Sequence, residues 1–194
     1  MDAMLDAKQR ALRLSIPETI ETGRMILRAA KSGDGPASFE AVAESADELK
    51  PWMPWAHPEP TLEGSITFHA DAEAKWVSRD MLDFQWRDKV TGRLIGKCGF
   101  HTISWDVPKL EIGYWVRTSM AGNGYCREAV NALVAFAHRE LGAKRLEICS
   151  DPRNQKSRNV AEHCGFTLEG ILRKNMRDPY GGLRDSCMYA LILE

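Results

Sequence analysis

A strand, a glycine-containing turn and a helix follow one another between residues 111 and 141. The residues Glu-Ile-Gly-Tyr-Trp-Val at 111–116 are typical of a strand, and Ala-Gly-Asn-Gly-Tyr-Cys at 121–126 opens a helix expected over residues 124–141. Such a turn exposes backbone N–H groups, and the helix start adds unpaired donors and the positive end of its dipole. The sequence therefore predicts a site for a pyrophosphate here, with an ordinary tight turn as the alternative.

The elements around this turn are mixed in type. Helical patterns cover residues 1–14, 39–49, 61–79 and 157–164. Strand patterns cover residues 24–28, 82–87, 94–103, 110–116, 145–150 and 186–193. This order predicts an α+β fold with a central mixed sheet, part of which is an antiparallel meander. The length favours one domain over residues 1–194, in which residues 1–20 form an N-terminal helical extension.

Composition limits the partners. The chain has 194 residues and a formal net charge of −1, so no overall field attracts nucleic acid or an anionic membrane, and neither is expected as a partner. No apolar run is long enough to span a bilayer, and the first residues lack the apolar segment of a signal peptide. The expected location is therefore cytoplasmic.

The cysteines and histidines are scattered. Five cysteines occur singly, without a Cys-x-x-Cys pair, and the five histidines include no His-Glu-x-x-His arrangement. Such spacing favours neither a disulfide framework nor a structural zinc site. We expect free cysteines that pack as small apolar side chains, and no metal site.

Several passages, in this order and spacing, resemble the GNAT acyltransferases, in particular ribosomal-protein N-acetyltransferases of the RimJ/RimL type. The passages are residues 22–28, 94–100, 111–116, 154–157, 164–170 and 185–191. Two positions depart from the family pattern: Ala121 stands where Gln or Arg is usual, and Cys126 where Gly or Ala is usual. Both changes leave the backbone donors in place. The resemblance implies a twisted, mostly antiparallel GNAT-like sheet flanked by helices.

The resemblance also implies a reaction: direct transfer of the acetyl group of acetyl-CoA to an amine within a ternary complex. Asn154 resembles the residue that hydrogen-bonds the pantetheine arm, although a turn would also select it. Arg158 lies in a basic cluster that can meet the 3′-phosphate or simply face solvent. The predicted contacts with acetyl-CoA are Trp115, Val116, Arg117, Ala121, Gly122, Asn123, Gly124, Tyr125, Cys126, Asn154, Ser157 and Arg158.

Acetyl transfer needs a base for the amine, a donor for the developing oxyanion and a proton for the departing sulfur. Glu111 is the candidate base, acting through water, unless it is a solvated strand residue. His101 is the second candidate, because its reference pKa suits the task, unless it has no role. Ser157 resembles the family serine that contacts the sulfur, although helix capping would also select a serine there. A backbone N–H of Trp115 or Val116 is expected to face the oxyanion.

The acceptor side is expected at a proline-rich loop. Trp52 and Trp55 lie there, either as recognition residues or as anchors of the loop, and with His101 they are the predicted substrate contacts. The resemblance suggests a peptide or protein N-terminal α-amine as acceptor and a possible homodimer. Two alternatives stay open: acetylation of a small amine such as an antibiotic, polyamine or amino acid, and a non-catalytic domain that binds coenzyme A and regulates.

Overall fold

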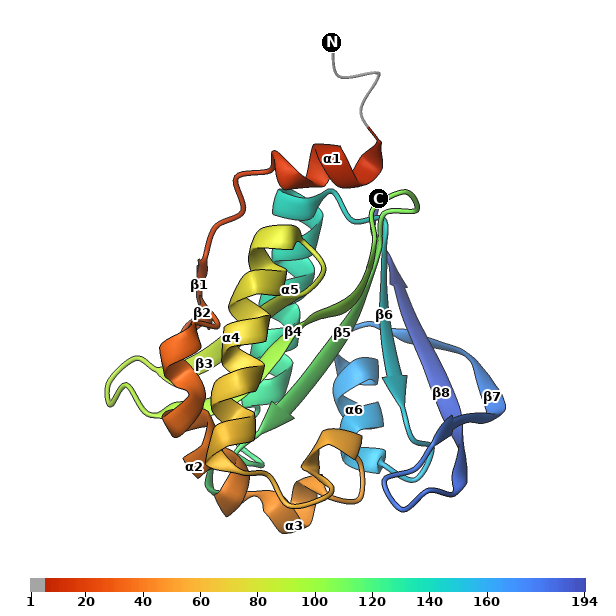
Figure 1. Ribbon diagram of the computed structural model, residues 1–194. Coiled ribbons are helices and arrows are strands. Elements are labelled where there is room, and N and C mark those ends of the chain that lie inside the picture. The colour runs from red at the N-terminus through yellow and green to blue at the C-terminus, as the bar shows by residue number, and fades with distance from the viewer. Residues whose placement is uncertain (1–5) are drawn as a thin grey trace.

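An eight-stranded sheet forms the centre of the protein, whose computed structural model describes residues 6–194 (Figure 1). The strand order is β1-β2-β3-β4-β5-β6-β8-β7, and every neighbouring pair is antiparallel except β5 with β6. The predicted mixed, mostly antiparallel α+β fold is confirmed. The strands are β1 (Thr19–Glu21), β2 (Met25–Ala29), β3 (Leu82–Asp88), β4 (Leu94–Ser104), β5 (Lys109–Val116), β6 (Arg145–Ser150), β7 (Thr167–Arg177) and β8 (Leu183–Ile192).

Helices cover both faces of this sheet. On β3, Phe84 packs edge-on against Phe136 of α5, with ring centroids 5.4 Å apart, whereas the next residue, Gln85, lies 3.1 Å from His69 of α4. Because successive strand residues point to opposite faces, α5 and the middle of α4 lie on opposite sides. The helices are α1 (Ala7–Leu12), α2 (Gly35–Glu44), α3 (Ala46–Leu49), α4 (Leu62–Ser78), α5 (Tyr125–Leu141) and α6 (Gln155–His163).

The best-predicted helices have clear end signals. Thr61 caps α4 by accepting a hydrogen bond from Gly64 N at 3.0 Å, and α5 ends at Gly142 in a left-handed conformation with φ of 63°. Both helices were expected from these residues. Of the helix predicted over residues 1–14, the structure shows Ala7–Leu12, and residues 1–5 lie outside the described residues.

The sequence predicted the starts of two helices at the wrong residues. The helix predicted over residues 39–49 begins at Gly35 and divides into α2 and α3 at Ser45, whose hydroxyl donates to Ala41 O at 2.7 Å. Serine hydroxyls that bond to the backbone compete with the helix ladder, which accounts for the break. The helix predicted from Ser157 begins at Gln155 instead, because Asn154 takes the capping position.

Candidate active site

The candidate site lies where β5 and β6 part. Three residue pairs join these strands, the last being Glu111 opposite Glu147, and beyond them the strands diverge with α6 between their ends (Figure 1). A cavity of about 590 Å³ opens there, with walls from α2, α4, α6, β4, β5, β6 and residues 52–55. Its polar lining includes Lys97, His101, Glu111, Tyr114, Ser150, Asp151, Asn154 and Ser157.

The backbone of β5 directs N–H groups into this gap. Arg117 N donates to Ile95 O of β4 at 2.8 Å, and donors alternate in direction along an antiparallel pair. Trp115, two residues earlier, therefore turns its N–H towards β4, whereas Tyr114 and Val116 turn theirs towards the diverging β6. Of the two groups predicted to face an oxyanion, this direction favours Val116 over Trp115.

The turn at residues 121–126 has an open backbone. Gly122 and Gly124 adopt φ of 79° and 77°, a region that side chains disfavour, and Gly124 directly precedes α5. No atom lies within 4 Å of the position that a Cβ on Gly122 would occupy, so a ligand can approach the backbone closely. Asn123 shapes the turn by donating from Nδ2 to Met120 O and Ala121 O at 3.2 and 3.1 Å.

Arg24, which sequence analysis did not single out, holds this turn from the side. Its Nη1 donates to Asn123 O at 2.9 Å, and its guanidinium lies 4.2 Å from the centre of the Tyr125 ring. It also pairs with Glu128 in the first turn of α5 at 2.7 Å, which neutralises a carboxylate beside the predicted anion site. The Cys126 side chain is half-buried and packs against the core, and desolvation raises the pKa of its thiol to about 12.

Three of the predicted acetyl-CoA contacts line the cavity, namely Trp115, Asn154 and Ser157. The side chains of Arg117 and Arg158 are engaged with protein partners. Arg158 donates from Nε to Tyr189 OH at 3.0 Å and from Nη1 to Pro152 O at 3.2 Å. The others are on the chain from β5 to α5: Val116, Ala121, Gly122, Asn123, Gly124, Tyr125 and Cys126.

Arg117 is a structural link. Its side chain is buried and pairs with Glu40 at 2.5 Å and Glu44 at 2.6 Å, both on α2. Glu44 also accepts from Ser119 N at 3.2 Å. Hydrogen bonds from Ser119 and Arg117 lower the pKa of Glu44 from 4.5 to about 2. These contacts join a wall of the cavity to the strand end that leads into the glycine turn.

We expect Glu44→Gln to destabilise the protein by about 1 kcal/mol at pH 7, because its hydrogen bonds are to a charged group but solvent screens a partly exposed carboxylate. A carboxyl group whose pKa is lower in the folded than in the unfolded protein stabilises the folded state fully at any pH above its pKa in the unfolded protein. This stabilisation is lost as the pH falls through its pKa in the folded protein. The difference in unfolding temperature between the two proteins should thus be constant above pH 4.5 and shrink towards pH 2. Thermal unfolding at pH 7, 4.5 and 2.5 measures this, with the exposed Glu48→Gln as control. A pH-independent difference would exclude the charge as its cause.

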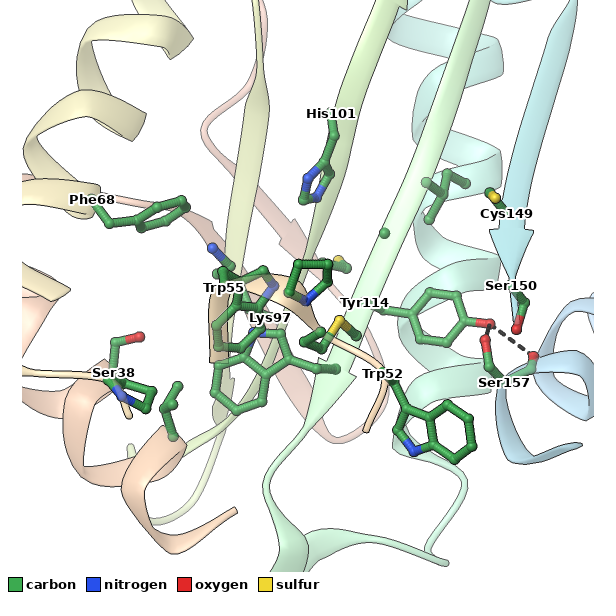
Figure 2. Close-up of a pocket in the computed structure, with 18 of the residues that line it drawn as sticks. Ser38, Trp52, Trp55, Phe68, Lys97, His101, Tyr114, Cys149, Ser150 and Ser157 are labelled. Carbon is green, nitrogen blue, oxygen red and sulfur yellow. Dashed lines mark hydrogen bonds between the residues drawn. The ribbon is translucent and has the colours of Figure 1, made fainter. Parts of the chain in front are cut away.

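Ser157 faces the cavity beside Tyr114. Tyr114 OH donates to Ser157 O at 2.9 Å and lies 3.2 Å from Ser157 Oγ, as Figure 2 shows. Asn154 accepts from Ser157 N at 3.1 Å, so Asn154 and not Ser157 caps α6, and the capping explanation for the serine is wrong. Burial raises the pKa of the Tyr114 phenol, which stays protonated and able to donate.

Glu111 and His101 line the same cavity. Glu111 accepts from Thr102 Oγ1 at 3.0 Å. His101 is the extra residue of an irregularity in β4, where the pairing with β5 shifts between Phe100 and Thr102. Figure 2 shows His101 and Phe68 across the cavity from Tyr114 and Ser157. Both candidate bases therefore border the cavity, and His101 does so on the side opposite Tyr114 and Ser157.

Trp52 and Trp55 line the cavity from the proline-rich segment. Trp55 is 50% exposed and packs against Trp115, with ring centroids 6.2 Å apart, so it serves both as an anchor and as an accessible wall. At the rim, His57 contacts Tyr180 of the β7–β8 connection edge-on at 5.4 Å.

Sequence reasoning missed Tyr114, Lys97 and Asp83. Tyr114 lies within the strand motif at residues 111–116. The register that turns its side chain towards α6 depends on strand pairing, which cannot be read from the sequence. Lys97, which lines the cavity, forms a 2.7 Å ion pair with Asp83, whose side chain is 1% exposed. The sequence signal that could have found this pair is a lysine and an aspartate within two apolar strands, because such residues are seldom buried unless they are paired.

Among residues 6–194, no group of three or more His, Cys, Asp or Glu side chains is placed to hold a metal ion. Over the same residues, no helix combines the length and apolarity needed to cross a bilayer. The five cysteines are free.

This fold and site define an acetyltransferase: a family model described as an acetyltransferase (GNAT) domain matches residues 24–167, and the chain belongs to this family. Among named relatives, an uncharacterized N-acetyltransferase of Bacillus licheniformis, p20, is 29% identical over 188 residues, 90% of this chain and 96% of that one. The ribosomal-protein-serine acetyltransferase of Escherichia coli K12 is 29% identical over 136 residues, 69% of each chain.

Solved structures share the fold. RimL, a ribosomal L7/L12 α-N-protein acetyltransferase solved with coenzyme A, superposes with a TM-score of 0.85 at 24% identity, covering 91% of this chain and 98% of that one. The microcin C7 self-immunity acetyltransferase MccE, solved with acetyl-CoA and AMP, gives 0.83 at 22% identity, covering 89% and 94%. The resemblance to the RimJ/RimL type is therefore confirmed.

Proposed function

We propose that the protein transfers the acetyl group of acetyl-CoA to the α-amine of a peptide or protein N-terminus. The observation that carries this proposal is the parting of β5 from β6, which opens a cavity beside the strand that leads into an exposed glycine turn. An acyl carrier with a long arm and a diphosphate needs both a gap for the arm and backbone donors for the phosphates.

The residues present fit acetyl-CoA, which supplies the acetyl group as a thioester. The open backbone at Gly122 and the helix start after Gly124 suit the diphosphate, and the departures at Ala121 and Cys126 leave these donors unchanged. Asn154 and Ser157 line the gap along which the arm would lie. Val116 N–H points towards the same gap and is assigned to the developing oxyanion.

The acceptor side combines aromatic walls with a carboxylate. Trp52, Trp55 and Phe68 form apolar walls, and Glu111 provides negative charge that attracts an ammonium. The names of the Escherichia coli relative and of RimL point to a protein N-terminus. MccE, named as a microcin C7 self-immunity acetyltransferase, was solved with the small molecule AMP as well as acetyl-CoA, which supports a small amine as the second candidate.

Steady-state kinetics with a panel of amines tests the proposal. Thiol release from acetyl-CoA is followed with peptides that carry a free α-amine, with the same peptides blocked at that amine, and with a polyamine and an aminoglycoside. We expect turnover of the free peptides and loss of turnover on blocking. Higher kcat/KM for the small amines would instead support the second candidate. No release with any amine, from protein that binds acetyl-CoA by calorimetry, would favour a non-catalytic domain.

A further inference from the structure

A buried carboxylate with one unused oxygen, that of Asp83, lies next to Lys97 and His101, which line the acceptor side of the cavity. Asp83 Oδ2 pairs with Lys97 Nζ at 2.7 Å, and Lys97 Nζ lies 3.8 Å from the centre of the Phe68 ring. Asp83 Oδ1 is buried without a hydrogen-bond partner among the described residues, and His101 Nε2 lies 3.8 Å from it. An unsatisfied buried acceptor is costly, so its approach to an imidazole calls for an explanation.

The local sheet structure is shaped around this pair. The irregularity in β4 places His101 as an extra residue, a device that re-aims side chains beside active sites. Gly99 and Gly113 are opposite each other on β4 and β5. A Cβ on Gly99 would lie 2.6 Å from Asp83 Oδ1, and a Cβ on Gly113 would lie 2.9 Å from His101 Nε2. The two glycines thus keep the space in which His101 and Asp83 meet.

The charged groups that face His101 come from three strands: Asp83 of β3, Lys97 of β4 and Glu111 of β5. Desolvation within the cavity lowers the pKa of His101 first of all, although the side chain is 44% exposed. Lys97 lowers this pKa further, whereas Asp83 and Glu111 raise it. His69 of α4 is occupied elsewhere, with Nδ1 2.7 Å from Ser65 O and Nε2 near Gln85, and burial lowers its pKa too. At neutral pH the His101 imidazole is therefore neutral and able to take a proton.

Reference pKa values separate the two candidate bases. An α-ammonium titrates near about 7.7–8.0, a glutamate near about 4.3 and a histidine near about 6.5. Proton transfer from such an ammonium to a free glutamate is uphill by roughly 3.5 pH units, and to a free histidine by roughly 1.2–1.5. The lowered pKa of His101 adds to the second difference. The best general base has a pKa close to the working pH, which favours His101 for the proton and leaves Glu111 to attract the ammonium.

We propose that His101 accepts the proton of the acceptor ammonium and that Asp83 is its positioning residue. After a small rotation of the imidazole ring, His101 Nε2–H donates to Asp83 Oδ1, and the lone pair on His101 Nδ1 is left to take the proton. Catalytic hydrogen bonds are often longer than usual before substrates bind. The neutral amine forms the C–N bond as the C–S bond breaks. Its second proton goes to the sulfur, and His101 returns the first to solvent. This assignment rests on the proposed acetyl transfer.

The test compares pH profiles of kcat/KM for His101→Gln, Asp83→Asn and Glu111→Gln, with the exposed His138→Gln as control and a peptide acceptor that the wild type uses. We expect His101→Gln to lower kcat/KM about 100-fold at pH 7. In the pH profile of this variant, the fall of kcat/KM on the acidic side (the acidic limb) should move up to the amine's own pKa of about 8. The loss of kcat/KM relative to the wild type should shrink at pH 9.5, where the amine is already neutral. Asp83→Asn should move the limb below that of the wild type, because the lost carboxylate had raised the pKa of His101.

Calorimetric binding of acetyl-CoA confirms that each variant is folded, and His101→Gln decides alone if Asp83→Asn does not fold. A His101→Gln profile with the wild-type limb and rate would overturn the proposal. So would a limb that moves to about 8 in Glu111→Gln but not in His101→Gln, since Glu111 would then be the base. Failure of the wild type to acetylate any amine refutes the proposed function instead, and that result is read before any variant is compared.

Discussion

Gly124→Asp is expected to weaken acetyl-CoA binding about 100-fold relative to Gly124→Asn. Both side chains have nearly the same shape, and both Asp and Asn tolerate the left-handed backbone with φ of 77° that this position requires. The two variants therefore share any backbone strain and differ in one charge. A unit charge about 5 Å from a phosphate, at an effective dielectric constant near 20, costs about 3 kcal/mol, or roughly two decades in affinity.

Calorimetric titration of acetyl-CoA into both variants measures this difference. Arg24 Nη2 lies 3.8 Å from the position of a Cβ on Gly124, so it offsets part of the repulsion, and the remaining gap should narrow as salt is added. Equal affinities of the Asp and Asn variants at low salt, both close to the affinity of the wild type, would contradict an anion at this turn. Equal but weak affinities would indicate that the glycine is needed for its backbone alone.

The parts of the site that the sequence predicted are those with local signals. The turn at residues 121–126 could be located because glycines at 122 and 124 and the helix after them are neighbours in the chain. Its left-handed backbone follows from the same two residues. The walls at Trp52 and Trp55 were likewise indicated by prolines that end the preceding helix.

The parts that could not be predicted depend on pairing between distant segments. Arg117 follows the strand motif directly and was expected beside the cofactor, yet its side chain is held by two glutamates more than 70 residues earlier. Nothing near Arg117 in the chain indicates those partners. The register shift between β4 and β5 that exposes His101 could not be predicted either, because such an irregularity depends on how two strands pair and not on the sequence of one of them.

Ser157→Ala is expected to lower kcat about 100-fold while the affinity for acetyl-CoA stays nearly unchanged. A general acid typically raises the rate roughly 100- to 10,000-fold. A thiol with a reference pKa of about 8.5 is already a good leaving group, so we expect the contribution of Ser157 to be at the lower end of that range. Ser157 Oγ lines the gap, and Asn154 fixes the first turn of α6 that presents it. Burial raises the pKa of Tyr114, so its hydroxyl stays protonated. It donates to Ser157 O and lies 3.2 Å from Ser157 Oγ, close enough to replace a proton that the serine gives to the sulfur.

A double-mutant cycle with Tyr114→Phe distinguishes a relay from two separate acids. If Tyr114 acts through Ser157, Tyr114→Phe alone has a smaller effect on kcat, and adding it to Ser157→Ala changes little. Independent acids would give effects that multiply. An unchanged kcat in Ser157→Ala would mean that the sulfur departs as a thiolate without protein help. The serine would then be a residue of the α6 first turn that merely borders the gap, and rate control would rest with the amine side, where His101 and Glu111 lie.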